Sequence, residues 1–429
     1  MRRAVMGQRR RVAITGLGFI TSIGNDRAAV TASLRELRHG IARCDLGGPD
    51  RPLAVKVAGT IKGFDVDSFY WSKWSWPPEY AFAPNTLRSL APHGLYALCA
   101  AQQAVADARL TPELLRDEAT ALFTSSAGSA FMLYGHLTGM HHHPAMRASP
   151  LGVVSAISGT LNFNLGTFFQ IRGGICGFVS ACASSSHALG YAYDEVSLGR
   201  YERVMVVGAE DLNADCVVPF MSMNALSACA DPDRASRPFD QGRDGFVASG
   251  GATALIVESA DAASARGAVP YAEFLGWGQS SDGFNVAMPH PDGEGLARAI
   301  RRALQAAELG PGDIGYVNAH ATSTPQGDRA EAMALQEVFT RAGARPAVSS
   351  TKGLTGHPLS MAGAMEAGFC ALALRDGFVP GNVNLEEPDP ACAGLDLPRV
   401  TSSQPPGIVL SNSSGFGGSN VVLVLGSWK

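Results

Sequence analysis

The sequence contains no apolar run of membrane-spanning length and no strong excess of either charge. A helix that crosses a bilayer needs about 20 consecutive apolar residues, and no segment offers them. The formal net charge is only −4 over 429 residues, which gives no reason to expect binding to a polyanion. Neither a membrane nor a nucleic acid is therefore predicted as a partner.

Cysteine is sparse, and its spacing excludes two common uses. The eight cysteines show neither the paired spacing of a zinc site nor the density of a disulfide scaffold, so no metal is predicted. Residues 12–18 are broken by glycines and predict a first strand, not a secretion signal. A cytoplasmic location follows as the expectation. The arginine-rich residues before this strand, up to Arg11, are predicted to be a disordered tail.

The chain alternates short apolar runs with alanine-rich helical patterns. It is 46% hydrophobic and 17% charged, which is enough for a sizeable core. Residues 204–208 and 254–257 predict strands buried on both faces, whereas residues 94–108 and 295–307 predict helices. Because no low-complexity linker divides these elements, the alternation predicts an α/β fold packed as one unit.

One cysteine lies where a predicted strand meets a predicted helix. Cys182 follows an apolar run and precedes the small residues that begin a helix over 183–198. A thiol at that point faces the positive end of a helix dipole and several unpaired backbone N–H groups. Both favour the thiolate, so Cys182 is predicted to be a nucleophile of low pKa. A buried structural cysteine is the alternative.

Three turns in the second half of the chain are rich in glycine, serine and threonine. The first covers residues 318–325, the second 350–358 and the third 412–420. Each contains side chains able to act beside a nucleophile: His320, then Lys352 and His357, then Phe416 between Gly415 and Gly417.

With these residues the chain resembles the β-ketoacyl-acyl-carrier-protein synthases, the condensing enzymes of fatty-acid synthesis, in the branch of bacterial synthases I and II. The resemblance runs from about Val12 to the C-terminus. It implies an α/β, thiolase-like fold of five layers, αβαβα, built from two pseudo-repeated halves. The first half, residues 11–265, would carry the nucleophile, and the second, residues 266–429, both histidines.

The resemblance also implies a reaction. Cys182 would hold an acyl group, and a malonyl thioester on acyl carrier protein would lose CO₂ and attack it to give a 3-ketoacyl product. His320 and His357 would donate hydrogen bonds to the enolate oxygen. No cofactor is implied, because the phosphopantetheine arm arrives with the carrier protein. The second subunit would be another copy, or a ketosynthase-like partner in a heterodimer for polyene or polyketide synthesis.

Further roles come from the same resemblance. Lys352 and Glu331 would pair and orient the histidines. Phe416 would be a gate, and its backbone N–H would form an oxyanion hole with that of Cys182. The substrate arm would contact Thr322, Thr324, Gly415 and Gly417.

The chain departs from the family at several positions. Ala127 stands where some relatives have isoleucine at the dimer interface, which predicts a deeper channel for long or unsaturated chains. Arg88 and Arg147 match carrier-docking positions, but the basic patch around them is thin. Residues 140–147, with three histidines, predict an exposed turn and no metal site. Ser414 replaces a phenylalanine that is common before the gate.

Three other classes of protein share parts of this pattern. Thiolases need a second cysteine in the late turn, where this chain has Phe416. Ketosynthases with a Cys-His-Asn site use one histidine, although Asn412 is near the late turn. Non-catalytic chain-length subunits usually lack the cysteine, so Cys182 argues against that class.

Overall fold

The structure is a computed structural model that describes residues 9–48, 51–142 and 149–429. Its ten-stranded sheet runs in the order β10-β9-β11-β12-β8-β1-β7-β6-β4-β5. The first five strands in sequence, apart from a small separate hairpin, are β1 (Val12–Ile20), β4 (Thr120–Ser125), β5 (Ile175–Phe178), β6 (Arg203–Glu210) and β7 (Gly251–Ser259). The others are β8 (Ala272–Ser281), β9 (Tyr316–Asn318), β10 (Ala347–Ser349), β11 (Ile408–Gly415) and β12 (Ser419–Gly426).

The two halves of this sheet repeat the same topology. In each half the second strand pairs in parallel with the third and the fourth, as β4 does with β5 and β6 and as β9 does with β10 and β11. The fifth strand pairs antiparallel with the fourth and the first. The halves join where β1 pairs antiparallel with β8. The predicted pseudo-repeat is thus visible in the strand order.

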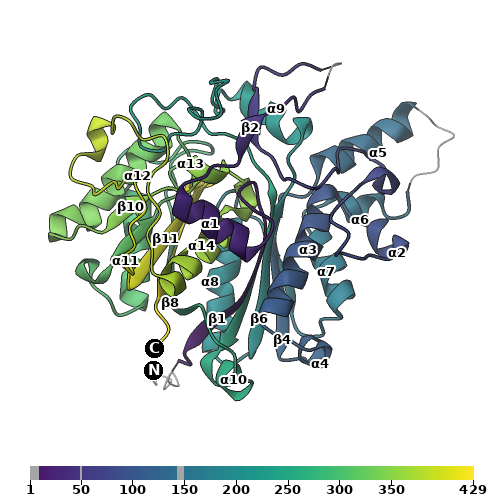
Figure 1. The fold of residues 1–429 in the computed structure, drawn as a ribbon, viewed down its shortest axis with the longest axis horizontal. Coiled ribbons are helices and arrows are strands. Elements are labelled where there is room, and N and C mark those ends of the chain that lie inside the picture. Colours follow the sequence, from purple (N-terminus) through teal and green to yellow (C-terminus); the bar gives the residue numbers. More distant parts are fainter. Residues whose placement is uncertain (1–8, 49–50, 143–148) are drawn as a thin grey trace.

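Helices cover both outer faces and fill the space between the two halves (Figure 1). Helices α3 (Pro92–Asp107) and α7 (Thr160–Phe169) pack outside the first half, and α11 (Glu294–Ala306) and α12 (Pro325–Val338) outside the second. The middle layer contains α8 (Ser184–Ser197) and α14 (Ala362–Asp376). These are the five layers, αβαβα, that the sequence predicts.

The remaining elements are short or peripheral. They are the hairpin β2 (Ile41–Arg43) and β3 (Val57–Gly59) and the helices α1 (Arg27–Glu36), α2 (Pro84–Leu87), α4 (Pro112–Arg116), α5 (Ala130–His142), α6 (Gly152–Ala156), α9 (Ala214–Ser222), α10 (Ala260–Ala265) and α13 (Lys352–Thr355). The predicted boundary between residues 265 and 266 falls between α10 and β8 and stays a prediction. Within the described residues, no helix has the length and apolar character needed to cross a membrane.

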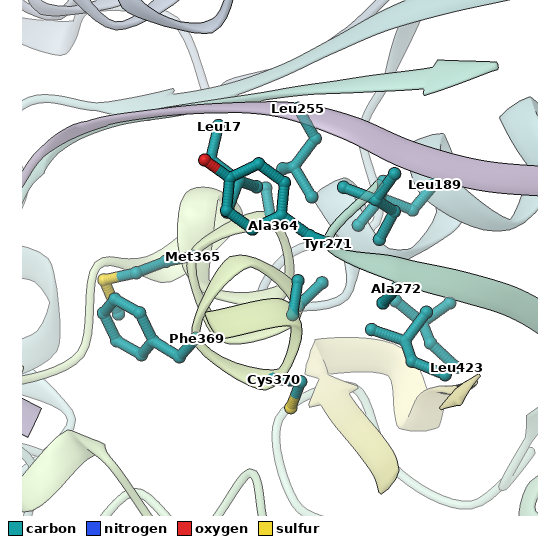
Figure 2. Close-up of a cluster of buried hydrophobic side chains, with 14 of the residues drawn as sticks. Leu17, Leu189, Leu255, Tyr271, Ala272, Ala364, Met365, Phe369, Cys370 and Leu423 are labelled. Atoms are coloured by element: carbon teal, nitrogen blue, oxygen red, sulfur yellow. The ribbon is translucent and has the colours of Figure 1, made fainter. Parts of the chain in front are cut away.

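The central core lies around α14. Met365 and Phe369 of this helix are buried together with Leu189 of α8 and Leu423 of β12 (Figure 2). Strand β6 is buried on both faces, because Val204 and Val206 join this core while Met205 and Val207 join the core under α3. Continuous apolar strands of this kind are what the sequence predicts.

Two local predictions are wrong. Arg10 and Arg11 are not part of a disordered tail, because they donate to Glu202 at 2.7 Å and to Glu273 at 2.6 and 2.8 Å. The predicted turn at residues 140–147 is helical at its start, since α5 continues to His142. The rest of that tract lies outside the described residues.

The parallel strands place the candidate site. The turn after β5 leads to Cys182, the turn after β9 leads to His320, and the turn after β10 leads to Lys352 and His357. β9 and β10 are parallel neighbours, so their carboxyl ends lie at one edge of the sheet and the His320 and His357 turns can meet there. β5 lies at the other end of the strand order, so Cys182 is contributed by the other half of the fold.

Candidate active site

The turn that carries Cys182 is tight and strained. Ala181 has a φ of 51°, in the left-handed region that alanine rarely adopts. The turn is tied to the start of α8, because Ser180 N donates to Ser184 Oγ at 2.8 Å, and Ser184 Oγ donates to Ala181 O at 2.6 Å. The thiol is thereby held at the N-terminal end of α8, as predicted.

The two histidines converge on this thiol. His357 Nε2 lies 3.0 Å from Cys182 Sγ. One ligand atom each of Cys182, His320 and His357 lie within 4.8 Å of one another. The two imidazole rings are 5.3 Å apart and nearly perpendicular, at 87°. A nucleophile and two imidazoles therefore face one small volume, although they come from both halves of the chain.

Lys352 fixes the orientation of His320. Its ammonium Nζ lies 3.3 Å from His320 Nδ1. An ammonium group can only donate, so Nδ1 accepts and the imidazole proton resides on Nε2. The neutral ring then presents an N–H group on its other side, which is what a developing enolate oxygen requires.

The predicted pairing of Lys352 with Glu331 is wrong. The Lys352 ammonium forms its ion pair with Glu366 of α14, and both side chains are fully buried. Glu366 lies near the start of α14, and this helix brings its carboxylate to the lysine in the turn that follows β10. A buried ammonium needs such a partner. Glu366 was missed in the sequence, although a lone acid in the apolar run 362–374 is the available signal.

Glu331 has a different task. Its two carboxylate oxygens accept from the backbone N–H groups of His320 at 2.8 Å and Ala321 at 2.7 Å, and from the Asn412 amide at 2.8 Å. The carboxylate thus holds the backbone of the His320 turn. The Asn412 amide donates to this carboxylate. This contact argues against a Cys-His-Asn site in which Asn412 would be the third member.

Burial determines the protonation of the thiol. It raises the pKa of Cys182 to about 12, against the opposing effect of the Lys352 ammonium. The prediction of a low-pKa thiolate is therefore wrong for this structure, because desolvation of the sulfur outweighs the position at a helix start. The thiol is neutral and hydrogen-bonded to His357, so an imidazole is available as its base.

Burial also keeps both histidines neutral. It lowers the pKa of His320 and of His357 well below the usual value, and the Lys352 ammonium lowers both further. Burial raises the pKa of Glu331 and of Glu366 to about 7. Lys352 opposes the shift in both acids. The centre thus combines neutral imidazoles with an ammonium–carboxylate pair behind them.

A cavity of about 450 Å³ opens in front of these groups and contains Cys182 and both histidines in its lining. Aromatic rings form a row along one wall of the cavity. The ring centroid of Phe416 lies 6.1 Å from that of Phe220, and the Phe220 centroid lies 5.3 Å from that of Phe246. Phe246 lies 5.3 Å from the His357 ring. Phe416 is 42% exposed, so the outer end of this row of rings reaches solvent. Phe220 was missed, since nothing in its sequence neighbourhood distinguishes it from a core residue of α9.

Gly415 allows the gate turn to approach the nucleophile. A Cβ at this position would lie 2.7 Å from Ser180 O and 3.0 Å from Cys182 N, closer than real contacts allow. The backbone before Phe416 therefore packs directly against the backbone of Cys182. This proximity is compatible with the two N–H groups sharing one oxyanion.

The other predicted substrate residues are divided between the cavity and its surroundings. Thr322 and Thr324 line the cavity, with their hydroxyls 3.1 Å apart. Gly415 lines it too, whereas Gly417 and Ala127 are not among the lining residues. Ala127 is exposed on the single chain, outside the cavity.

The carrier-docking predictions are not settled by the site. Arg88 is exposed at the end of α2, where its guanidinium donates to Asn85 at 3.4 Å. Arg147 lies outside the described residues. Among the described residues that line the cavity there is no lysine or arginine, and Asp244 and Asp282 lie in its wall.

Cys182, His320 and His357 also have the spacing of metal ligands, as one thiol and two imidazole nitrogens within 4.8 Å. The Lys352 ammonium, 3.3 Å from His320, places a positive charge beside them and opposes a cation. The predicted lack of a metal or cofactor stays a prediction.

Known proteins share this architecture. Residues 9–263 match the N-terminal domain of beta-ketoacyl synthase and residues 271–386 its C-terminal domain. The chain is 36% identical, over 98% of its length and 100% of the relative's, to the 3-oxoacyl-[acyl-carrier-protein] synthase 1 of Escherichia coli strain K12.

Two solved structures are similar over the whole fold. The first is a beta-ketoacyl synthase from Burkholderia phymatum STM815, with a TM-score of 0.89 and 32% identity. The second is the ishigamide ketosynthase/chain length factor, with a TM-score of 0.86 and 30% identity. Both matches cover 98% of this chain and 100% of the other.

A condensing-enzyme fold with a thiol and two imidazoles in one cavity defines the class. The chain belongs to the beta-ketoacyl synthase family. It is accordingly an acyltransferase that joins acyl units through carbon–carbon bond formation.

Proposed function

We propose that this enzyme condenses an acyl group held on Cys182 with a malonyl group on acyl carrier protein, giving a 3-oxoacyl carrier. The observation that carries the proposal is the meeting of one thiol with two neutral imidazoles in one cavity. The 36% identity to a 3-oxoacyl-[acyl-carrier-protein] synthase supports the choice of carrier and reaction.

Loading begins with proton transfer. His357 Nε2, 3.0 Å from the sulfur, takes the thiol proton as Sγ attacks the acyl thioester. The backbone N–H groups of Cys182 and Phe416 bind the oxyanion. The carrier thiol leaves and takes the proton from His357, so the acyl group remains on Cys182 and the imidazole is neutral again.

Condensation then needs a carbanion equivalent. The bond between the malonyl carboxylate and its neighbouring carbon breaks, CO₂ leaves, and the electron pair moves to the thioester oxygen. His320, whose proton is held on Nε2 by Lys352, donates to that oxygen. His357 accepts the thiol proton on Nε2 during loading, so its own proton is then on Nδ1, and it donates to the enolate oxygen only after that proton has exchanged through solvent to Nε2. Its Nδ1 has no hydrogen-bond partner among the described residues. The enolate carbon attacks the acyl carbonyl, the bond from that carbonyl carbon to Cys182 Sγ breaks, and the released thiolate takes a proton from solvent.

We assign the neighbouring residues by their positions. Thr322 and Thr324 line the cavity and would bind the pantetheine arm, and we propose that the reaction uses no other cofactor. Phe416 would move aside as the arm enters. We propose a cytoplasmic enzyme that acts as a homodimer, with Ala127 of the exposed loop contributing to an acyl channel, and with Arg88 and Arg147 contacting the acidic carrier.

A second arrangement has a specific observation behind it. The ishigamide ketosynthase/chain length factor aligns with 98% of this chain, so the catalytic subunit of a heterodimer is the other candidate. The mass of the purified chain in solution separates the two. A homodimer with activity on its own supports the first proposal, whereas a chain active only with a partner subunit supports the second.

The experiment that tests the reaction uses the purified chain with an acyl carrier and a malonyl carrier. Mass spectrometry is expected to show acylated protein and then a 3-oxoacyl carrier. Cys182→Ser should not be acylated, and His320→Asn should be acylated but release no CO₂. His39→Asn is the matched control, because His39 pairs with Asp233 and does not line the cavity. A product formed without decarboxylation, or by Cys182→Ser, would overturn the proposal.

A further inference from the structure

The imidazole of His357 and the thiol of Cys182 come from different halves of the fold. Cys182 follows β5 in the first half, whereas His357 lies between β10 and α14 in the second. The 3.0 Å distance between His357 Nε2 and Cys182 Sγ therefore depends on how the two halves are held together beside this contact. A catalytic base also needs a group that orients it, but His357 Nδ1 has no hydrogen-bond partner among the described residues. The orientation of this imidazole must come from its backbone.

The backbone of His357 itself is fixed by the segment that precedes β7. His357 N donates to Val247 O at 2.7 Å, and His357 O accepts from Ser249 N at 3.1 Å. The turn that follows is strained, because Leu359 has a φ of 46°, in the left-handed region that a leucine rarely adopts. Such a conformation persists only where the surrounding contacts hold it. The turn after His357 therefore needs a second point of attachment.

Ser360 provides that attachment, and its partners belong to the first half of the fold. Glu210, the last residue of β6, accepts through Oε2 from the Ser360 hydroxyl and, at 3.3 Å, from the Ser360 backbone N–H. From the neighbouring strand β4, Ser125 Oγ donates to Ser360 O at 3.3 Å. Gly208 of β6 lets the turn approach, because a Cβ there would lie 3.2 Å from Met361 Cα. Two adjacent strands of the first half thus bind one residue of the turn that follows His357.

The contact between Glu210 and Ser360 is buried and charged. Glu210 is 1% exposed and Ser360 is 3% exposed. Burial raises the pKa of Glu210 to about 7, and the Ser360 hydroxyl opposes this shift. Above that pH the group is a carboxylate, and a hydrogen bond to a carboxylate is stronger than one between neutral groups. Among the described residues, Ser360 is the only hydrogen-bond donor to the Glu210 side chain, so the two residues depend on each other.

We propose that Glu210 and Ser360 form a brace that holds His357 where it can take the thiol proton, which makes both of them positioning residues for the acylation of Cys182. The inference rests on the proposed function, in which His357 is the base of the loading step. Neither Glu210 nor Ser360 lines the cavity. The brace therefore acts on the rate of loading and not on the binding of the acyl carrier.

Single-turnover acylation of Cys182 at about pH 8, where Glu210 is a carboxylate, tests the brace. Intact mass gives the maximal rate and the carrier concentration at half of that rate. Ser360→Ala removes the hydroxyl donor, so the maximal rate should fall by about threefold to tenfold, the effect of one lost hydrogen bond. Glu210→Gln leaves a weaker, neutral acceptor and should slow acylation by about threefold. The half-saturating concentration should stay within about twofold of wild type in both variants, because no contact with the carrier is lost.

The double variant shows whether the two residues act through one contact. If they do, the combined substitutions Ser360→Ala and Glu210→Gln should cost no more than Ser360→Ala alone, whereas independent effects would multiply. Ser33→Ala is the matched control and should keep the wild-type rate. Ser33 is also buried, its Oγ donates to Ile23 O at 2.8 Å, and it does not line the cavity.

The outcomes separate the brace from the function on which it rests. If wild-type enzyme takes up no acyl group, the proposed function fails and the brace with it. If wild-type enzyme is acylated and a folded single variant keeps the maximal rate, the brace alone is refuted. Losses that multiply in the double variant, or a higher half-saturating concentration in place of a lower rate, would refute it as well. Thermal unfolding checks folding, and either single variant suffices if the other does not fold.

Discussion

Lys352 Nζ lies between Glu366, with which it forms a buried ion pair, and His320 Nδ1, from which it is 3.3 Å away. The lysine therefore has two effects on one imidazole. As a donor it holds the ring proton on Nε2. As a charge it adds to the larger effect of burial, and together they lower the pKa of His320 and keep the ring neutral.

The substitution Lys352→Met is expected to damage condensation more than loading. Without the ammonium, His320 is free to carry its proton on the wrong nitrogen, and Glu366 becomes an unpaired buried acid. We expect CO₂ release to fall by about 10²- to 10³-fold, as for the loss of one preorganised donor, while acylation of Cys182 continues. Radiolabelled malonyl carrier measures the first and intact mass the second. Lys73→Met, at an exposed site, is the control, and equal losses in both steps would contradict the assignment.

Glu331→Gln is expected to loosen the His320 turn. The amide can accept at one oxygen only, and its NH₂ group meets an N–H donor where the carboxylate accepted. The free energy of unfolding should fall by about 1–3 kcal/mol, which urea titration measures, and decarboxylation should fall with it. An unchanged rate in the folded variant would mean that the carboxylate does not position His320.

Alkylation of Cys182 should depend steeply on pH. Because burial raises the pKa of this thiol to about 12, the thiolate fraction increases roughly tenfold per pH unit below that value. Iodoacetamide should therefore label the free enzyme faster at each step from about pH 7 to pH 10, with no plateau. A plateau below about pH 8 would show instead a thiolate stabilised at the helix start.

The sequence predicts some elements of the structure well and others not at all. The helices around residues 94–108 and 295–307 match α3 and α11 closely, because alanine-rich amphipathic patterns are local. The convergence of Cys182, His320 and His357 was implied by the family resemblance, because the turns that carry these residues are far apart in the sequence. The lysine–Glu366 pair was not, since it depends on how α14 places Glu366 near the turn after β10.

The prediction of a low pKa for the Cys182 thiol was wrong for a related reason. Helix position is visible in the sequence, and it favours the thiolate at Cys182. The depth of the sulfur in a cavity formed by two halves of the fold is not visible there, and desolvation is the larger effect.

Ser414 tests the shape of the cavity. It lines the cavity, and its hydroxyl donates to Asn420 Oδ1 at 2.7 Å. Ser414→Phe would place a ring beside Phe416, and we expect loading of long acyl chains to slow by about tenfold more than loading of short ones, because an overpacked wall costs about 1–3 kcal/mol. Ser414→Ala removes only the hydroxyl and should leave the ratio between lengths within about twofold. Equal effects of both variants would exclude a steric cause.

Ala127→Ile tests the acyl channel. The larger side chain on the exposed loop should reduce turnover of long acyl carriers by about tenfold and spare short ones. Steady-state rates across a series of chain lengths provide the comparison. An unchanged preference would place the channel elsewhere.

The most direct measurement is peptide mass spectrometry of the enzyme isolated from its native cells. The account predicts an acyl group attached to Cys182, whose mass also identifies the natural chain, and the loss of this adduct when malonyl carrier is added. An enzyme that turns over without any adduct on Cys182, or with the acyl group on another residue, would contradict it.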